Sequence, residues 1–172
     1  MKNSEIDNVF RFLSRVKFLL SATNQHGVHS PFVYNFITKG LYQKGTKTFS
    51  VTENVLIKSI SYFSYQKIRI IKGSHELKSK LDSVFENLEY ESLPYDIMYT
   101  NVKNEPFKNI DTQYRHNESM LIVTGIYESK KNLALWNEIK KREEVRVTID
   151  VYHCGLVFFR REQAKEHFKI RI

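Results

Sequence analysis

Three neighbouring side chains, Ser74, His75 and Glu76, have the residue types of a nucleophile, a base and an acid. A serine hydroxyl needs an adjacent base to become a nucleophile, and in many hydrolases the serine sits in a G-x-S-x-G turn that exposes it. No such motif surrounds Ser74. We therefore interpret this segment as an exposed turn and assign no catalytic residue to it.

Histidine and cysteine spacing does not indicate a metal site. His26 and His29 have the spacing of a loose pair of ligands, but no third ligand is apparent in the sequence. Cys154 is the single cysteine, so it cannot form a disulfide within the chain, and we expect a buried structural thiol. The sequence predicts neither a metal site nor an internal disulfide.

Length and composition indicate one domain spanning residues 1–172. The chain is 41% hydrophobic and 13% aromatic, which suffices for one core but not for two typical domains. Charges interrupt the apolar residues near the start, which argues against a signal peptide or membrane span and predicts a cytoplasmic protein. The net charge of +8 permits an acidic partner such as nucleic acid, but the basic residues are scattered, as on a solvated surface.

The helical region is expected to occupy residues 1–65, with about three helices. Apolar residues recur at three- and four-residue steps over residues 6–20, which predicts an amphipathic helix that docks on the domain or a second subunit, with a membrane surface as the alternative. Ser30 and Pro31 have the types of an N-cap and a first helical residue, and Gly40 is the expected end. Ser50 and Glu53 form a capping-box pattern that starts a third helix.

Strand-like and helical segments alternate over the remaining residues, 66–172. Apolar runs predict strands over residues 68–71, 96–100 and 120–123, and helical patterns cover residues 76–88 and 128–142. This alternation indicates a parallel sheet with helical crossovers. Two further runs, residues 145–151 and 156–159, predict a hairpin connected by residues 152–155. The expected fold class is α/β, with a mostly parallel sheet closed by a C-terminal antiparallel hairpin.

Two segments resemble one bacterial branch of the class I S-adenosylmethionine-dependent methyltransferases. ATNQHGVHSPFVYNFITKG, residues 22–40, is similar to the helical region before that family's sheet, and VTIDVYHCGLVFFRREQAKEHFKIRI, residues 147–172, is similar to its end. Residues 95–100 and 126–145 also resemble the family. The resemblance implies a reduced Rossmann-like sheet whose strands take the order 1-4-5-7-6 of the family scheme.

The family's methyl donor binds at a glycine-rich turn after the first strand, where backbone amides approach the ligand beside an acidic residue. The corresponding region here reads IRIIKGSHEL. Gly73 and Ser74 match the first glycine and the small residue after it, but Ile71 stands at the acid and Leu77 at the later glycine. The resemblance therefore implies a degraded donor turn.

Three further family features are missing from the sequence. Only residues 89–94 lie between the predicted helix and the next strand, whereas another strand, crossover helix and strand need about 30 residues or more, so the family's second and third strands are absent. After the fourth strand, Asn101 and Asn104 stand where the family has an acid and a histidine. After the fifth strand, Thr124 and Gly125 replace a pair of acids. These losses argue against the family's usual chemistry.

We therefore expect a shortened, degenerate relative that has lost S-adenosylmethionine binding and catalysis, needs no cofactor, and acts as a noncatalytic scaffold or interaction protein with an unidentified macromolecular partner. One alternative is an active methyltransferase for an unidentified small molecule, with the donor bound by Gly73, Ser74 and Asn101. A second alternative is a basic RNA-binding module. Its base-stacking and basic side chains would be Tyr62, Tyr65, Tyr90 and Tyr114 with Arg69, Lys72 and Lys103.

The loss of two strands also predicts a partner. The first strand, which begins at Ile68 and ends at Ile71, would become a sheet edge with unpaired backbone groups. Arg69 and Lys72 are placed to guard this edge. Symmetric pairing of two such edges would form a homodimer.

Overall fold

The computed structural model describes residues 2–72, 75–104 and 112–172, with side chains from Ile6 onward in the first range. This part of the chain holds five α-helices and one six-stranded sheet. The helices are α1 Lys2–Ser21, α2 Pro31–Phe36, α3 Val51–Phe63, α4 His75–Asp82 and α5 Lys130–Lys141. The strands are β1 Ile68–Ile70, β2 Tyr95–Asn101, β3 Arg115–Thr124, β4 Val147–Asp150, β5 Cys154–Phe158 and β6 Glu166–Lys169.

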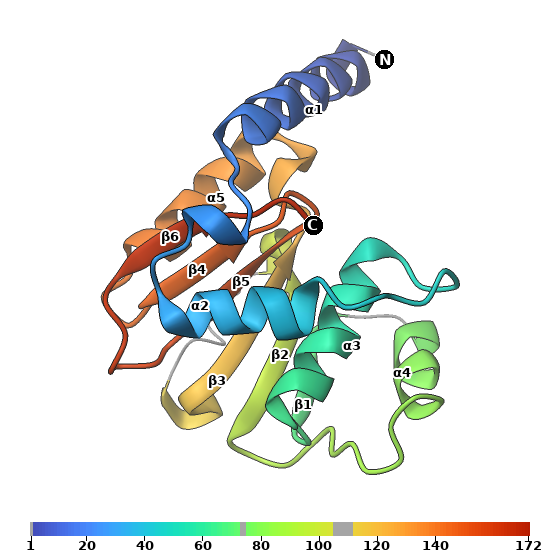
Figure 1. The fold of residues 1–172 in the computed structure, drawn as a ribbon. Coiled ribbons are helices and arrows are strands. Elements are labelled where there is room, and N and C mark those ends of the chain that lie inside the picture. Colours follow the sequence, from blue (N-terminus) through green and yellow to red (C-terminus); the bar gives the residue numbers. More distant parts are fainter. Residues whose placement is uncertain (1, 73–74, 105–111) are drawn as a thin grey trace.

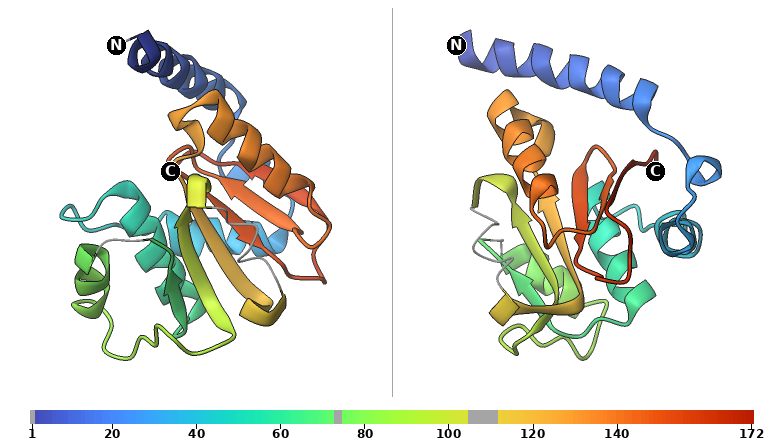
Figure 2. Two further views of the ribbon diagram at one scale, coloured as in Figure 1. Left: turned by 180° about the vertical axis from the view of Figure 1, so that it is seen from behind. Right: turned by 90° about the vertical axis from the view of Figure 1, so that its left-hand side faces the viewer.

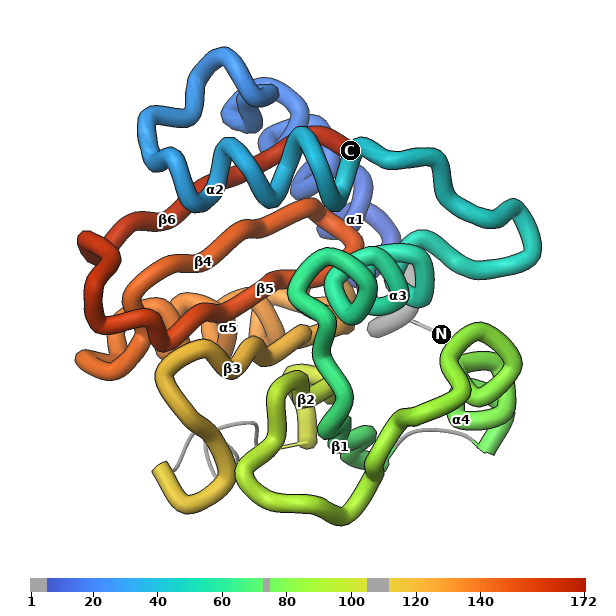
Figure 3. Tube along the Cα trace, turned by 60° about the horizontal axis from the view of Figure 1, so that its bottom comes forward, coloured from blue at the N-terminus to red at the C-terminus, as the bar shows by residue number. Residues whose placement is uncertain are grey.

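The sheet has the strand order β1-β2-β3-β5-β4-β6, which can be followed across Figure 3. β5 runs antiparallel to both of its neighbours, and the other three neighbouring pairs are parallel. The predicted α/β class and the antiparallel β4–β5 hairpin are therefore confirmed. The hairpin connection is shorter than predicted, because Cys154 and Gly155 already belong to β5.

Strand β6 was not predicted from the sequence. Its residues alternate between half-buried and exposed positions, so they form no apolar run. Backbone hydrogen bonds place it beside β4: Glu166 N donates to Arg146 O at 2.9 Å, and Ile170 N donates to Asp150 O at 2.8 Å. On its other side, Thr23 N donates to Lys169 O at 2.9 Å, so the segment after α1 covers this edge of the sheet.

Helices cover both faces of the sheet. Figures 1 and 2 show α2 and α3 on one face and α5 on the other. Successive strand residues point to opposite faces. Ile97 accordingly belongs to the apolar cluster beneath α2 and α3, and Met98 to the cluster around Trp136 of α5.

The two predicted helix caps are confirmed, and the predicted end at Gly40 lies one residue before the end of the helical segment, whose last turn is π-helical and not α-helical. The Ser30 hydroxyl accepts a hydrogen bond from Val33 N, and Ser50 and Glu53 form both bonds of the capping box of α3. After α2 the chain continues as a π-helical turn, Ile37–Leu41, that includes Gly40. A Cβ on Gly40 would lie 3.0 Å from the Phe36 ring, so this glycine permits close packing inside the turn.

Helix α4 ends at Asp82, earlier than the predicted residue 88. The following chain turns back so that Glu89 can pair with the start of β1: Ile68 N donates to Glu89 O at 2.8 Å, and Glu89 N donates to Gln66 O at 2.8 Å. Backbone pairing with a distant segment thus outweighs the helical pattern of residues 83–88. β1 is an edge of the described sheet, as predicted, and Glu89 pairs with one end of it.

Helix α1 extends away from the sheet (Figures 1 and 2). One of its faces docks on the domain, as predicted, through Ser14 and Phe18, which are 7% and 3% exposed. The Phe18 ring lies against the rings of Tyr127 and Tyr152. No helix within the described ranges combines the length and apolarity needed to cross a bilayer.

Candidate functional site

The carboxyl ends of β1, β2 and β3 lie at one edge of the sheet, because these three strands are parallel neighbours. Ligands of open α/β sheets bind at this edge. Asn101 lies there at the end of β2, beside Thr124 at the end of β3. Gly73 and Ser74, the predicted glycine turn of a donor site, lie outside the described residues.

The side chain of Asn101 is engaged by its own neighbours. Its Oδ1 accepts a hydrogen bond from the backbone N–H of Lys103 at 3.0 Å, at the 3-10 turn Val102–Asn104. Its amide lies against Gly125, whose φ of +75° favours glycine. A Cβ built on Gly125 would lie 2.5 Å from Asn101 Nδ2. The Asn101 side chain therefore fills the space between the ends of β2 and β3.

The turn after β2 ties the neighbouring segments together. Asn104 Nδ2 lies 3.5 Å from Ile71 O, at the limit of a hydrogen bond, and Lys103 Nζ lies 2.7 Å from Glu128 Oε2. Amides such as those of Asn101 and Asn104 donate and accept hydrogen bonds, but they do not take up a proton as a general base. This part of the edge offers hydrogen bonding, and it lacks an acid at Ile71, at Asn101 and at the Thr124–Gly125 pair, where the resemblance implies acids.

Asp150 is a buried acid that sequence analysis did not select. It ends β4, is 4% exposed, and adjoins a cavity of about 210 Å³ between α1 and α5 that is also lined by Lys17, Lys140 and Lys169. Burial raises the pKa of Asp150, and hydrogen bonds from Tyr127 and Tyr152 partly oppose this rise. In the sequence, apolar residues alternate with Arg146, Thr148 and Asp150, so the pattern gave no sign that Asp150 would be buried.

The contacts of Asp150 favour a structural role. Tyr127 Oη donates to Asp150 Oδ2 at 2.6 Å, and the backbone N–H of Tyr152 donates to Oδ1 at 2.9 Å. Tyr152 has a φ of +68°, an unfavourable conformation for a bulky residue. Both carboxylate oxygens are thus used to hold the hairpin turn and the turn that precedes α5.

A second cavity, of about 430 Å³, lies where α3, the β4–β5 connection and the end of the chain meet. Lys58, His153 and Arg171 line it. Burial lowers the pKa of Lys58, whose ammonium donates to Leu41 O at 2.8 Å, and burial together with Arg15 lowers the pKa of His153. These three basic side chains come from distant segments, and no sequence motif connects them.

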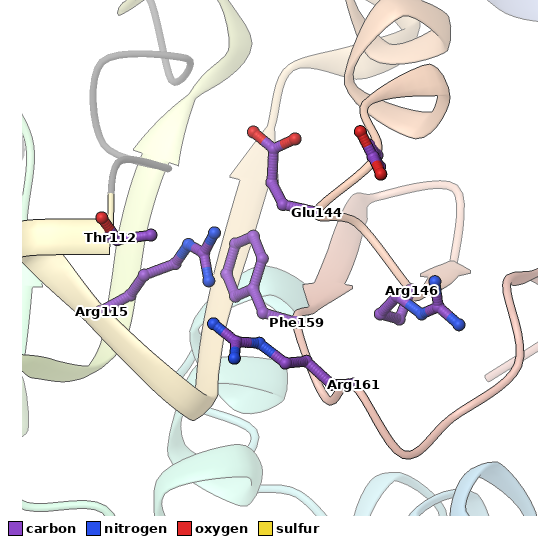
Figure 4. A pocket seen from close by; sticks show the side chains of 7 residues that line it. Thr112, Arg115, Glu144, Arg146, Phe159 and Arg161 are labelled. Carbon is purple, nitrogen blue, oxygen red and sulfur yellow. The ribbon is translucent and has the colours of Figure 1, made fainter.

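A third cavity, of about 380 Å³, lies at the opposite edge of the sheet, where β3 begins and β5 ends. Figure 4 shows Arg115, Arg161 and Glu144 around the ring of Phe159. The Arg115 guanidinium lies 4.2 Å from the centre of that ring, and Arg142 pairs with Glu144 at 2.6 Å. Burial opposes ionisation of Glu144, but hydrogen bonds and the nearby arginines outweigh it and lower the pKa. This cavity is separate from the edge at which a donor site was expected.

The predicted basic and aromatic surface is only partly assembled. Tyr65 is buried and donates a hydrogen bond to Glu118 O, and Tyr62 packs against Phe36 and Phe63.

The remaining tyrosines of this set already have cationic neighbours. The Arg69 guanidinium lies 4.9 Å from the Tyr114 ring and 5.5 Å from the Tyr95 ring, and Lys78 lies 4.3 Å from the Tyr90 ring. An RNA base that stacked on those ring faces would have to displace these cations.

Within the described residues, no three His, Cys, Asp or Glu side chains are grouped so that they could hold a metal ion. Cys154 is buried, as predicted, and burial raises the pKa of its thiol. No protein-family model, curated protein or solved structure matches this chain.

Proposed function

We propose that this chain is a methyltransferase-like protein that does not bind S-adenosylmethionine and acts as a noncatalytic scaffold or interaction protein in the cytoplasm. The position of Asn101 carries the proposal. Its amide packs against Gly125 and its Oδ1 accepts from Lys103 N, at the edge where the family resemblance implies an acid and an open donor pocket.

The edge position of β1 also supports this proposal. In the resembling family, the acid that binds the donor ribose ends a strand adjacent to the first strand. Here residues 75–94 form α4 and a return segment, and Glu89 makes a single bridge to Lys67. The described residues between β1 and β2 therefore supply no second strand from which such an acid would project.

The proposal is tested by isothermal titration calorimetry of the full chain with S-adenosylmethionine and with its demethylated product. We expect no binding at millimolar ligand. Micromolar binding of either compound would refute the proposal and support the active methyltransferase, with Asn101→Ala as the first variant to examine. An active methyltransferase of known donor affinity serves as the positive control, and a cooperative thermal transition shows that the titrated chain is folded.

The RNA-binding alternative predicts a different result. Counterion release makes the affinity for RNA fall steeply as salt increases. Titration of single-stranded RNA at two salt concentrations therefore distinguishes an RNA-binding module from a scaffold. Binding that weakens both at the higher salt concentration and in Arg69→Ala would support the RNA-binding module and contradict the scaffold proposal.

A further inference from the structure

Helix α1 carries an exposed apolar stripe on the side that faces away from the domain. Seven of its large apolar side chains are between 41% and 83% exposed. Five of them, Ile6, Val9, Leu13, Val16 and Leu20, follow alternating steps of three and four residues. These five residues, here called the α1 seam, have the a and d spacing of a heptad repeat.

The opposite side of α1 fixes the direction in which the seam points. Phe18 is 3% exposed and lies with its ring centre 5.5 Å from that of Tyr152. Tyr152 Oη also donates a hydrogen bond to Arg11 O at 2.9 Å. The helix is thus attached along one side, and its seam cannot turn toward the core without breaking these contacts.

The charges of α1 favour a protein partner over an anionic membrane. Amphipathic helices that bind membranes carry Lys and Arg on a polar face, from which these side chains must be free to reach the lipid headgroups. Here the Arg15 guanidinium lies 6.0 Å from the centre of the Tyr152 ring, and Lys17 lines the cavity between α1 and α5. Both side chains are exposed, but these contacts place them on the sides of α1 that adjoin the domain rather than in the seam.

A second copy of the same helix fits the seam in spacing and in size. Heptad-spaced side chains pack as knobs into the holes of another helix with the same repeat, and every copy of this chain carries that repeat. Phe12 and Leu19, which are 67% and 50% exposed, extend the seam on one side. Two facing stripes would bury on the order of 1,000 Å² in total, which is at the lower limit of the area that a specific interface needs.

We propose that the chain forms a homodimer through its α1 seam, which pairs with the α1 seam of a second copy. This interface is distinct from the edge-strand dimer predicted at β1, and it does not depend on whether the chain binds a methyl donor. Pairing would remove from water seven side chains whose exposure is otherwise unfavourable.

Sedimentation velocity of the full chain at micromolar concentrations tests this proposal. We expect a dimer for the wild type and a monomer for Leu13→Glu/Leu20→Glu, because two carboxylates would be desolvated in the seam. Both residues are more than half exposed, 51% and 83%, so the variant should still unfold in one cooperative thermal transition. Its midpoint should lose only the part of the wild-type value that rises with protein concentration, because that part comes from dimerisation. Val84→Glu is the matched control, since Val84 is 43% exposed and lies outside α1.

Three outcomes would overturn the proposal. A monomeric wild type would exclude self-association, and a dimer that persists in Leu13→Glu/Leu20→Glu would place the interface elsewhere, including at β1. Co-sedimentation of a monomeric wild type with phosphatidylcholine–phosphatidylserine vesicles, lost in the double variant, would assign the seam to a lipid surface instead.

Discussion

The side-chain amide of Asn101 lies so close to the α-carbon of Gly125 that a methyl group on Gly125 would come within 2.5 Å of Nδ2. This contact joins the carboxyl ends of β2 and β3, and Gly125 adopts a φ of +75° to make it. At the edge where a ligand of this fold class would bind, the contact leaves no room for a side chain at position 125.

Gly125→Ala should lower the free energy of unfolding by more than about 1 kcal/mol, because it adds a left-handed alanine and a steric conflict with Asn101. Urea denaturation of Gly125→Ala, Asn101→Gly and the double variant measures this. We expect the double variant to be more stable than the sum of the single effects predicts. Strict additivity would show that Asn101 does not restrict Gly125.

Asp96→Asn should destabilise the protein by about 1–3 kcal/mol near neutral pH. Asp96 Oδ2 accepts from Gln66 N and Lys67 N, each at 2.8 Å, and Oδ1 lies 2.9 Å from His116 Nε2. Burial would raise the pKa of Asp96, but these hydrogen bonds outweigh it and hold the pKa below its ordinary value.

The pH dependence of this effect has a defined sign. Because the folded-state pKa of Asp96 is lowered, its contribution is present above the ordinary Asp pKa and is lost as pH falls through the folded value. The difference between wild type and Asp96→Asn, measured by urea denaturation, should therefore shrink as the pH falls below the ordinary pKa of Asp. Glu138→Gln, in an exposed pair with Lys141, is the control and should change stability little. If the difference in the free energy of unfolding between wild type and Asp96→Asn stays constant as the pH falls, the lowered pKa of Asp96 is contradicted.

Gly155→Ala should destabilise the protein by about 1–3 kcal/mol through overpacking. Gly155 lies in β5 beneath the fully buried Trp136 ring, and a Cβ at this position would clash with that ring. Thermal unfolding of Gly155→Ala alone and combined with Trp136→Phe gives the comparison. Because Phe has a smaller ring, we expect Trp136→Phe to restore part of the thermal midpoint that Gly155→Ala loses. If the midpoint is not restored, the steric conflict in Gly155→Ala does not involve the Trp136 ring.

Local sequence signals predicted much of the fold. The Ser50–Glu53 capping box formed as expected because its two hydrogen bonds join residues three positions apart. The apolar runs of β2 and β3 and the β4–β5 hairpin were likewise visible as periodic patterns. Asn101 was expected directly after a strand over residues 96–100, and it is the last residue of β2.

Contacts between distant segments decided what the sequence could not. Glu89 ends the helical pattern after α4 by pairing with Ile68, and β6 forms because Arg146 and Asp150 supply its hydrogen bonds. The periodicity of α1 identified an apolar side, but only docking of Phe18 on Tyr127 and Tyr152 decided which residues stay exposed. Helix-cap hydrogen bonds and hydrophobic periodicity act over a few residues and can be read from the chain, whereas strand pairing and burial depend on which segments meet after folding.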